Sequence, residues 1–121
     1  MSLNKINLPG YPRPLGESPA IQWKGDYFGN SNYQQGGDKA FASDYGYSGI
    51  EEFAPQFGGY SQTGNYFMRA LMPANASNVN ETLAPCFNNC TVKWYYAANS
   101  VEVANNTNLA AEVCRVTVTL V

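Results

Sequence analysis

What this 121-residue chain lacks already excludes several functions. It contains no histidine, so no mechanism can depend on an imidazole base, an imidazole metal ligand or an imidazole pH switch. Charged residues make up only 13% of the chain, half of the usual ~25%. The net charge is −2 and no basic run occurs, which argues against a protein that binds nucleic acid through its phosphates. No apolar run approaches the roughly 18 residues of a membrane-spanning helix, so we expect no membrane contact.

Cysteine is also scarce, with only Cys86, Cys90 and Cys114 present. Three residues separate the first two cysteines, and this spacing fits either a small loop closed by a Cys86–Cys90 disulfide or reduced thiols. A structural zinc site usually needs four ligands, and no histidine is available to complete one. We therefore predict no metal site.

A catalytic motif is missing as well. Two neighbouring carboxylates occur at Glu51 and Glu52, but adjacent residues of a strand point to opposite faces and would not share a substrate. Asp26, Asn30 and Asn32 lack the closing glutamate of a calcium-binding EF-hand loop, so they predict a polar turn. The sequence thus predicts a protein that is not an enzyme and that uses no cofactor.

Proline is concentrated at the beginning of the chain, where four of the seven prolines fall in residues 1–19. Each proline fixes its own φ angle and disfavours the helical conformation of the residue before it, so we predict an extended arm over residues 1–19. The first eight residues are too polar for a secretory signal. A proline-stiffened arm loses little conformational entropy on binding, which suits contact with a neighbouring subunit.

Glycine and tyrosine dominate residues 25–66, which hold nine of the eleven glycines and six of the nine tyrosines. Because glycines interrupt every candidate helical window, we predict long loops here and no helix. Tyrosine offers a large apolar face, one hydroxyl and only two rotatable angles, so it is favoured at interfaces. The loop tyrosines either cap the core or form an interaction surface.

Alternation of apolar and polar residues predicts strands in the rest of the chain. It is clearest over 113–121, where every second residue from Cys114 to Leu120 is apolar. Further strands are predicted over 20–28, 65–72 and 91–98, and Val101 to Val103 fits the return strand of a hairpin. The predicted core residues are Trp23, Trp94, Val116 and Val118. Short strands with asparagine- and glycine-rich connections are typical of an antiparallel β-sandwich, jelly roll or barrel, so we predict one all-β domain over residues 20–121.

The combination of a proline-rich arm, tyrosine-rich loops, low charge and a short β-domain resembles that of virion structural proteins. Among them, it is similar to the small decoration (cement) proteins of tailed-bacteriophage capsids. The resemblance implies a protein made in the host cytoplasm that binds the capsid surface. Its implied partners are the major capsid protein and copies of itself, with a trimer favoured. On this interpretation the expected contact residues form two groups, one in the arm (Ile6, Leu8, Tyr11, Leu15) and one in the loops (Tyr33, Tyr45, Tyr47, Phe57, Tyr60).

Two other functions fit the composition. The first is another virion component, such as a coat, tail or fibre subunit. The second is a carbohydrate-binding β-module, in which an exposed Trp23 with Tyr27 and Asn30 would stack against a sugar.

Overall fold

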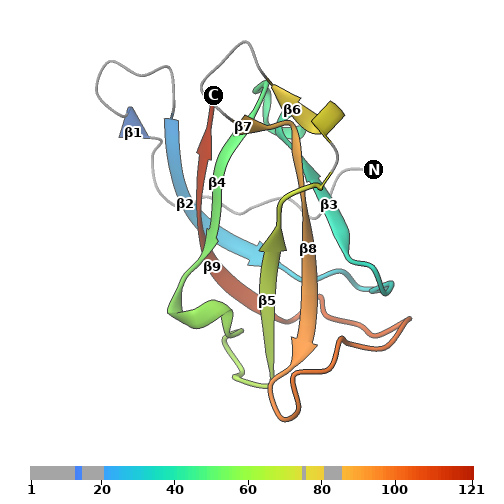
Figure 1. Ribbon diagram of the computed structural model, residues 1–121. Helices are drawn as coiled ribbons and strands as arrows, with labels where there is room; N and C mark the ends of the chain where they lie inside the picture. The colour runs from blue at the N-terminus through green and yellow to red at the C-terminus, as the bar shows by residue number, and fades with distance from the viewer. Residues whose placement is uncertain (1–12, 15–20, 75, 81–85) are drawn as a thin grey trace.

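The computed structural model describes residues 13–14, 21–74, 76–80 and 86–121 (Figure 1). Its regular structure consists mainly of antiparallel strands, which confirms the prediction of an all-β chain. The strands form two sheets, a six-stranded sheet in the order β1-β2-β9-β4-β7-β6 and a three-stranded sheet in the order β3-β8-β5. In the described part of the chain, the hydrogen-bonded ladders of the two sheets do not join into a closed barrel.

The described strands are β1 (Arg13–Pro14), β2 (Ile21–Phe28), β3 (Asp38–Phe41), β4 (Ile50–Pro55), β5 (Tyr66–Leu71), β6 (Val79–Asn80), β7 (Cys86–Phe87), β8 (Asn89–Tyr96) and β9 (Val113–Leu120). Three short 3-10 helices connect them, η1 (Ala42–Tyr45), η2 (Phe57–Gly59) and η3 (Ala76–Asn78). Among the described residues, no helix is long and apolar enough to cross a membrane. Apart from β1, the predicted arm over 1–19 lies outside the described residues.

Strand β9 forms the centre of the six-stranded sheet, because it pairs with β2 on one side and with β4 on the other. Its predicted apolar face, from Cys114 to Leu120, is buried. The opposite face is also partly closed, since Thr117 and Thr119 are buried there. Gln56 Nε2 donates a hydrogen bond to Thr117 Oγ1 at 3.1 Å, and Thr119 Oγ1 donates one to Glu52 Oε1 at 3.4 Å. A central strand therefore keeps its threonines satisfied through its neighbours.

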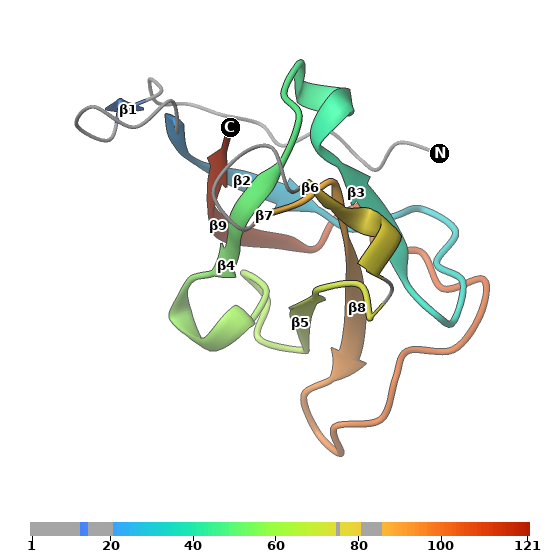
Figure 2. The same ribbon diagram turned by 45° about the horizontal axis from the view of Figure 1, so that its top comes forward.

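Strand β8 is the central strand of the smaller sheet and also connects it to the larger one. The chain leaves β7 and enters β8 across a single residue, Asn88. The backbone oxygen of Asn88 accepts a hydrogen bond from the Ala42 N–H at 3.0 Å, so η1 is tied to this crossing point. Figures 1 and 2 show β5 and β8 lying across one side of the layer formed by β2, β9 and β4.

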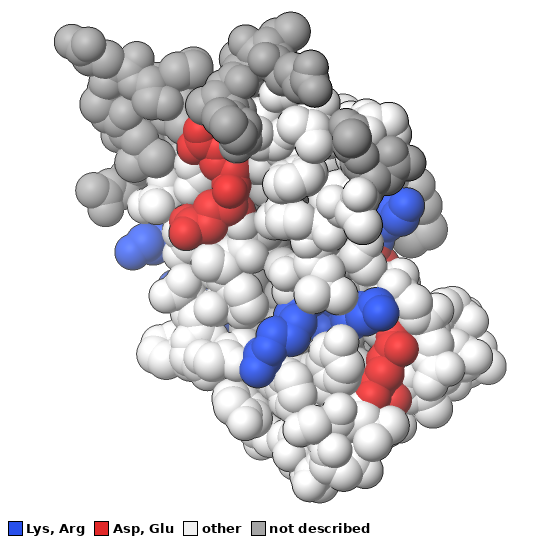
Figure 3. Space-filling model, viewed as in Figure 1, with Lys and Arg blue, Asp and Glu red and all other residues white. Residues whose placement is uncertain are grey.

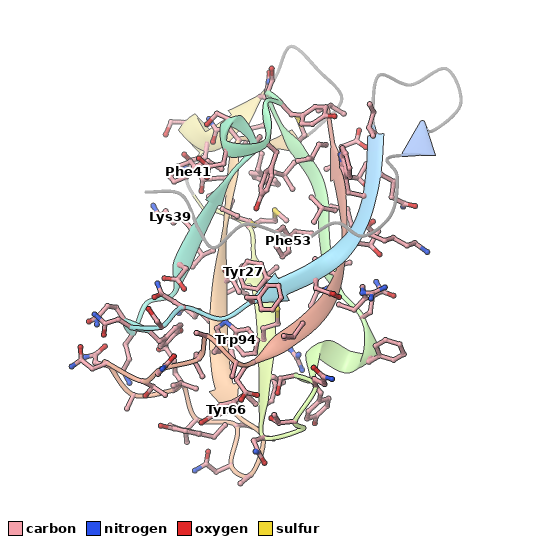
Figure 4. The ribbon with its side chains drawn as sticks, turned by 180° about the vertical axis from the view of Figure 1, so that it is seen from behind. Tyr27, Lys39, Phe41, Phe53, Tyr66 and Trp94 are labelled. Carbon is pink, nitrogen blue, oxygen red and sulfur yellow. The ribbon has the colours of Figure 1, made fainter. Side chains whose placement is uncertain are left out.

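The hydrophobic core lies between the two sheets. Tyr27 from β2, Phe53 from β4 and Trp94 from β8 point toward one another there (Figure 4). The ring of Tyr27 meets Phe53 edge-on at 5.8 Å and stacks on Trp94 at 6.4 Å between centroids. Burying side chains of this size contributes roughly 1.5–3 kcal/mol each, so these rings hold the sheets together. Of the predicted core, Trp94, Val116 and Val118 are fully buried, and Trp23 packs at the edge.

Residues 25–66 contain more regular structure than the predicted loops, because β3, β4 and the short 3-10 helices η1 and η2 lie within them. In β3 the inward-facing residues are Asp38 and Ala40. An aspartate and an alanine at these positions do not form a recognisable apolar pattern in the sequence. In β4 the register shifts between Ile50 and Glu52, and this bulge lets both Ile50 and Phe53 point inward although only two residues separate them. Burial alternates along β3, but neither strand shows the strict alternation of apolar and polar residues that predicts a strand from sequence.

The predicted hairpin return over Val101–Val103 is only partly present. Tyr95 and Glu102 form an isolated bridge, and no strand continues from it. Val103 is nevertheless buried, and its N–H donates to the Trp94 oxygen at 3.0 Å. The segment therefore covers the end of β8 as an ordered loop.

Candidate binding groove and outer sheet face

The most exposed aromatic side chain among the described large apolar residues is Phe57, with 86% of its surface accessible. It begins η2 with a φ of 55°, in the left-handed region that a bulky residue rarely adopts. Hydrogen bonds on both sides fix this turn: the Gln56 N–H donates to the Arg115 oxygen at 2.7 Å, and the Gly59 N–H donates to the Gln56 oxygen at 2.9 Å. Phe57 is thus displayed outward by a well-anchored backbone.

Gly59 allows the turn to pack directly against β5. Its φ is 84°, and a Cβ at this position would lie 2.5 Å from the Met68 backbone oxygen. Arg69 Nη1 strengthens the same contact by donating to the Gly58 oxygen and to the Met68 oxygen, both at 2.9 Å. A side chain at residue 59 would push the Phe57 turn off the sheet.

A surface groove of about 560 Å³ lies beside this turn. We call it the Phe57 groove; its lining residues are Asp26, Phe57, Tyr60, Ser61, Gln62, Val113 and Arg115. Asp26 and Arg115 are directly opposite each other on β2 and β9, and Arg115 Nε donates to Asp26 Oδ1 at 2.7 Å. Their bond is the one ion pair formed within the described part of the chain. The groove therefore combines aromatic walls with a neutralised pair of charges.

The outer face of the three-stranded sheet carries a second group of aromatic side chains. The rings of Phe67 and Tyr95 stack across β5 and β8 with centroids 5.2 Å apart, and Tyr60 packs on Phe67 at 5.6 Å. The Arg69 guanidinium lies 4.5 Å from the Phe67 ring centroid, a cation–π contact. In the register of β5 and β8, Arg69 lies directly opposite Lys93.

Basic side chains lie on this same face, which looks toward the viewer in Figure 3, and acidic side chains are visible in that view as well. The pairing of Lys39 with Thr91, and of Thr91 with Leu71, places Lys39 on the side of Lys93 and Arg69. We call the surface formed by Lys39, Tyr60, Phe67, Arg69, Leu71, Lys93 and Tyr95 the basic aromatic face. The three cations are far apart in the sequence, so only the sheet register brings them together.

The loop aromatics predicted as contact residues divide into two groups. Phe57 and Tyr60 are exposed, with Tyr60 half accessible, whereas Tyr45 and Tyr47 are partly buried against the core. Tyr33 is completely buried, so its prediction as an interface residue is wrong. The arm residues predicted to make contacts lie outside the described residues; they are Ile6, Leu8, Tyr11 and Leu15.

Tyr33 instead organises a polar network inside the fold. Its hydroxyl donates to Glu102 Oε2 at 2.6 Å and accepts from the Trp94 N–H at 3.2 Å. Burial, together with the hydrogen bond to Glu102, raises the pKa of Tyr33 well above its usual value. The Gly36 N–H also donates to Glu102 Oε2, at 2.9 Å. The network joins the turn after β2 to the loop after β8.

The three cysteines are free and buried, so the Cys86–Cys90 disulfide is not formed. Cys86 lies on β7 of the larger sheet, where its thiol donates to the Asn80 oxygen, whereas Cys90 lies on β8 within the core cluster. Burial raises the pKa of Cys90 to about 12 and that of Cys114 to about 11, which keeps these thiols protonated and unreactive. No metal-binding group of three or more acidic or cysteine residues occurs among the described residues.

The sugar-stacking residues suggested by the sequence do not form a surface. Tyr27 is completely buried in the core, and the Nε1 atom of Trp23 is also buried. Asn30 forms a turn instead: its Oδ1 accepts from the Asn32 N–H at 2.8 Å, and its Nδ2 donates to Asp38 Oδ1 at 3.3 Å. The predicted polar turn is therefore present, and a sugar face at Trp23 and Tyr27 is not.

The functional residues missed by sequence reasoning are those that need long-range pairing. Asp26 and Arg115 are 89 residues apart, and nothing in either local sequence predicts that they meet. Comparison with models of known protein families yields no match for this chain, and searches of curated proteins and of solved structures yield none either.

Proposed function

We propose that this protein is a structural component of a virion, and specifically a capsid decoration protein that stabilises the shell. Its partners are then the major capsid protein and other copies of itself. We further propose that the two facing sheets represent a β-sandwich. The observation that carries the proposal is the basic aromatic face, an outward-facing sheet surface on which Tyr60, Tyr95 and Arg69 cover the buried Phe67 ring and Lys39 and Lys93 lie nearby.

The composition of the basic aromatic face matches that of protein interfaces. Aromatic residues, methionine and arginine are enriched at interface centres, and this face has a three-ring stack with Arg69 on it. Leu71 of this face is 42% accessible and Met72, directly after it in the chain, is 38% accessible, which adds exposed apolar surface at the end of β5. Because the stack and the strand ladder already fix these side chains, little entropy is lost when a partner covers them.

Charge indicates the kind of partner surface. The chain as a whole carries −2, yet Lys39, Arg69 and Lys93 lie on one face. Exposed Glu51 and Glu52 lie on β4, in the other sheet. A partner that presents carboxylates to the basic aromatic face would be attracted and oriented by it. Many copies on a symmetric shell would multiply a modest affinity per copy.

The arm and the loop aromatics remain part of this proposal. Ile6, Leu8, Tyr11 and Leu15 would lie along the shell or along a neighbouring subunit. The alternative virion roles, a coat, tail or fibre subunit, use the same kind of protein contact. These alternative roles can be distinguished from a decoration protein by experiment, because a coat or tail subunit would assemble with itself into shells or tubes without a preformed particle.

Gradient centrifugation of particles tests the proposal. Particles banded from the culture that produces the protein should contain it, and added tagged protein should bind shells from which it has been stripped. Lys93→Glu should weaken shell binding by about tenfold, since a repelling charge then faces the acidic partner. Lys24→Glu makes the same charge change on exposed β2 of the other sheet and should bind normally. Protein that stays at the top of the gradient, or equal binding by both variants, contradicts the proposal.

A further inference from the structure

We propose that the Phe57 groove is a binding site for a short neutral carbohydrate, with Phe57 and Tyr60 packing on the sugar rings and Asp26, Arg115 and Gln62 bonding to their hydroxyls. This site shares Tyr60 with the basic aromatic face, but its other lining residues belong to β2, to β9 and to the segment that begins with the Phe57 turn. Its volume of about 560 Å³ lies within the usual range of small-ligand sites, about 300–1,000 Å³.

The backbone at Phe57 is the first argument for a ligand. A left-handed φ costs a non-glycine residue on the order of 1–3 kcal/mol, and such strain is concentrated at functional positions. Exposing most of an aromatic ring to water brings no compensating burial within the chain. The backbone strain and the exposure of the ring therefore occur at the same residue, Phe57, even though glycine occupies the next two positions. A ligand that covers the ring explains why a phenylalanine stands there.

The ion pair on the groove wall supplies directed hydrogen bonds. The Arg115–Asp26 bond uses only Nε and Oδ1, so the terminal guanidinium nitrogens and Asp26 Oδ2 remain for a ligand. Both side chains are partly accessible, at 45% and 25%. Each residue orients the other, which gives a fixed donor beside a fixed acceptor. This arrangement suits two adjacent hydroxyls of a sugar ring, because each hydroxyl both donates and accepts.

Gln62 and Ser61 complete the polar part of the groove. The Gln62 N–H donates to the Val113 oxygen at 2.8 Å, which fixes the backbone while the side chain stays exposed. Its amide adds one more donor and acceptor. Ser61 is buried, and its N–H donates to the Tyr66 oxygen at 2.8 Å, which ties this part of the groove to the start of β5.

The balance of charge selects the ligand class. Asp26 and Arg115 sum to zero, so the pair gives no net attraction to an anionic or to a cationic ligand. A purely apolar ligand would cover the ion pair without bonding to it, which is costly. A neutral carbohydrate has apolar C–H faces for the rings and hydroxyls for the polar groups. Of the ligand classes considered, it alone satisfies both halves of the groove.

Titration of the ¹⁵N-labelled chain with neutral oligosaccharides tests this inference. The panel contains glucose, galactose, mannose and N-acetylglucosamine oligomers, with sialylated and sulfated glycans as charged counterparts. We expect at least one neutral member to shift the amide resonances of Phe57, Gln62 and Val113, with a Kd of about 0.1–1 mM. Phe57→Ala and Gln62→Ala should each weaken that binding about tenfold, whereas Phe57→Trp should retain it.

Leu71→Ala is the matched control, because it removes an exposed apolar side chain from the basic aromatic face and leaves the groove intact. It should bind sugar like the original protein. Flat titrations across the panel, preference for charged glycans, or binding that survives Phe57→Ala would each overturn the inference. Shell binding is measured separately through the Lys93→Glu variant. Absence of carbohydrate binding would therefore not contradict the proposed virion role, and absence of shell binding would not contradict the carbohydrate site.

Discussion

The chain builds two aromatic clusters from the same residue types and uses them differently. The inner cluster of Tyr27, Phe53 and Trp94 lies between the sheets, with contacts at 5.8 and 6.4 Å. The outer cluster of Tyr60, Phe67 and Tyr95 lies on the basic aromatic face under the Arg69 guanidinium. The inner rings are held by burial between the sheets, whereas the outer rings are held by stacking, by one cation and by the burial of Phe67 under its neighbours. Position relative to the sheet, and not residue type, decides which rings hold the fold and which can meet a partner.

Trp94 and Tyr95 give the sharpest test of this difference, because they are adjacent and point to opposite faces of β8. Trp94→Ala should lower the free energy of unfolding by about 3–5 kcal/mol, since it leaves a cavity in the core. Tyr95→Ala should lower it by only about 0.5–1.5 kcal/mol, the worth of one aromatic pair. Urea denaturation followed by circular dichroism measures both. Equal losses would show that the outer stack is as structural as the core.

Two tyrosines extend the comparison to hydroxyl groups. Tyr33→Phe should cost about 1.5–3 kcal/mol, because it removes a bond to the Glu102 carboxylate and leaves the buried Trp94 N–H without its acceptor. Tyr60→Phe, on the exposed face, should change stability by less than about 0.5 kcal/mol. Thermal melts of the two variants compare them directly. A larger loss for Tyr60→Phe would contradict the assignment of Tyr33 to the interior.

The same contrast explains how far the sequence could predict the structure. Strands with regular alternation, such as 113–121 and 91–98, were predicted because one buried face leaves a period of two. Strand β4 was missed because its bulge breaks that period, and β3 because it buries Asp38 and Ala40. Tyr33 and Tyr60 have similar neighbours in the sequence, so local composition could not tell the buried ring from the exposed one. The groove and the basic aromatic face depend on strand register, which no local pattern specifies.

Phe57 allows a test in which stability and binding move in opposite directions. Phe57→Gly should raise the free energy of unfolding by about 1 kcal/mol, since glycine adopts a φ of 55° without strain. The same change should weaken carbohydrate binding about tenfold, as Phe57→Ala does, because both remove the ring. Phe57→Ala is the control, because it removes the ring and keeps the strained Cβ. If Phe57→Gly is no more stable than Phe57→Ala, the left-handed backbone does not cost energy, and the first argument for a ligand fails.

Asp38 provides the smallest expected effect, and it extends the comparison of inside and outside to carboxylates. Asp26 is outside and paired with Arg115, whereas Asp38 faces the core, where its Oδ2 atom has no hydrogen-bond partner within the described structure. Burial raises the pKa of Asp38, and the hydrogen bond from Asn30 only partly opposes this shift. In the unfolded chain, an aspartate has a pKa of about 3.9.

The sign of the pH dependence follows from that shift. Below about pH 3.9, Asp38 is protonated in both states, and its contribution to stability is fully present. As the pH rises, the unfolded chain releases the proton first. The contribution of Asp38 to stability therefore decreases progressively, and the decrease ends once the pH has passed the raised folded-state pKa. Asp38→Asn carries no titratable group, so the melting temperature of the original protein should fall relative to this variant across that window. Glu51→Gln, on the exposed part of β4, is the control and should melt in parallel with the original protein. If the melting temperature of Asp38→Asn also changes with pH in parallel with that of the original protein, water reaches the Asp38 carboxylate. The core is then accessible to water at β3, although it is closed to water at β8.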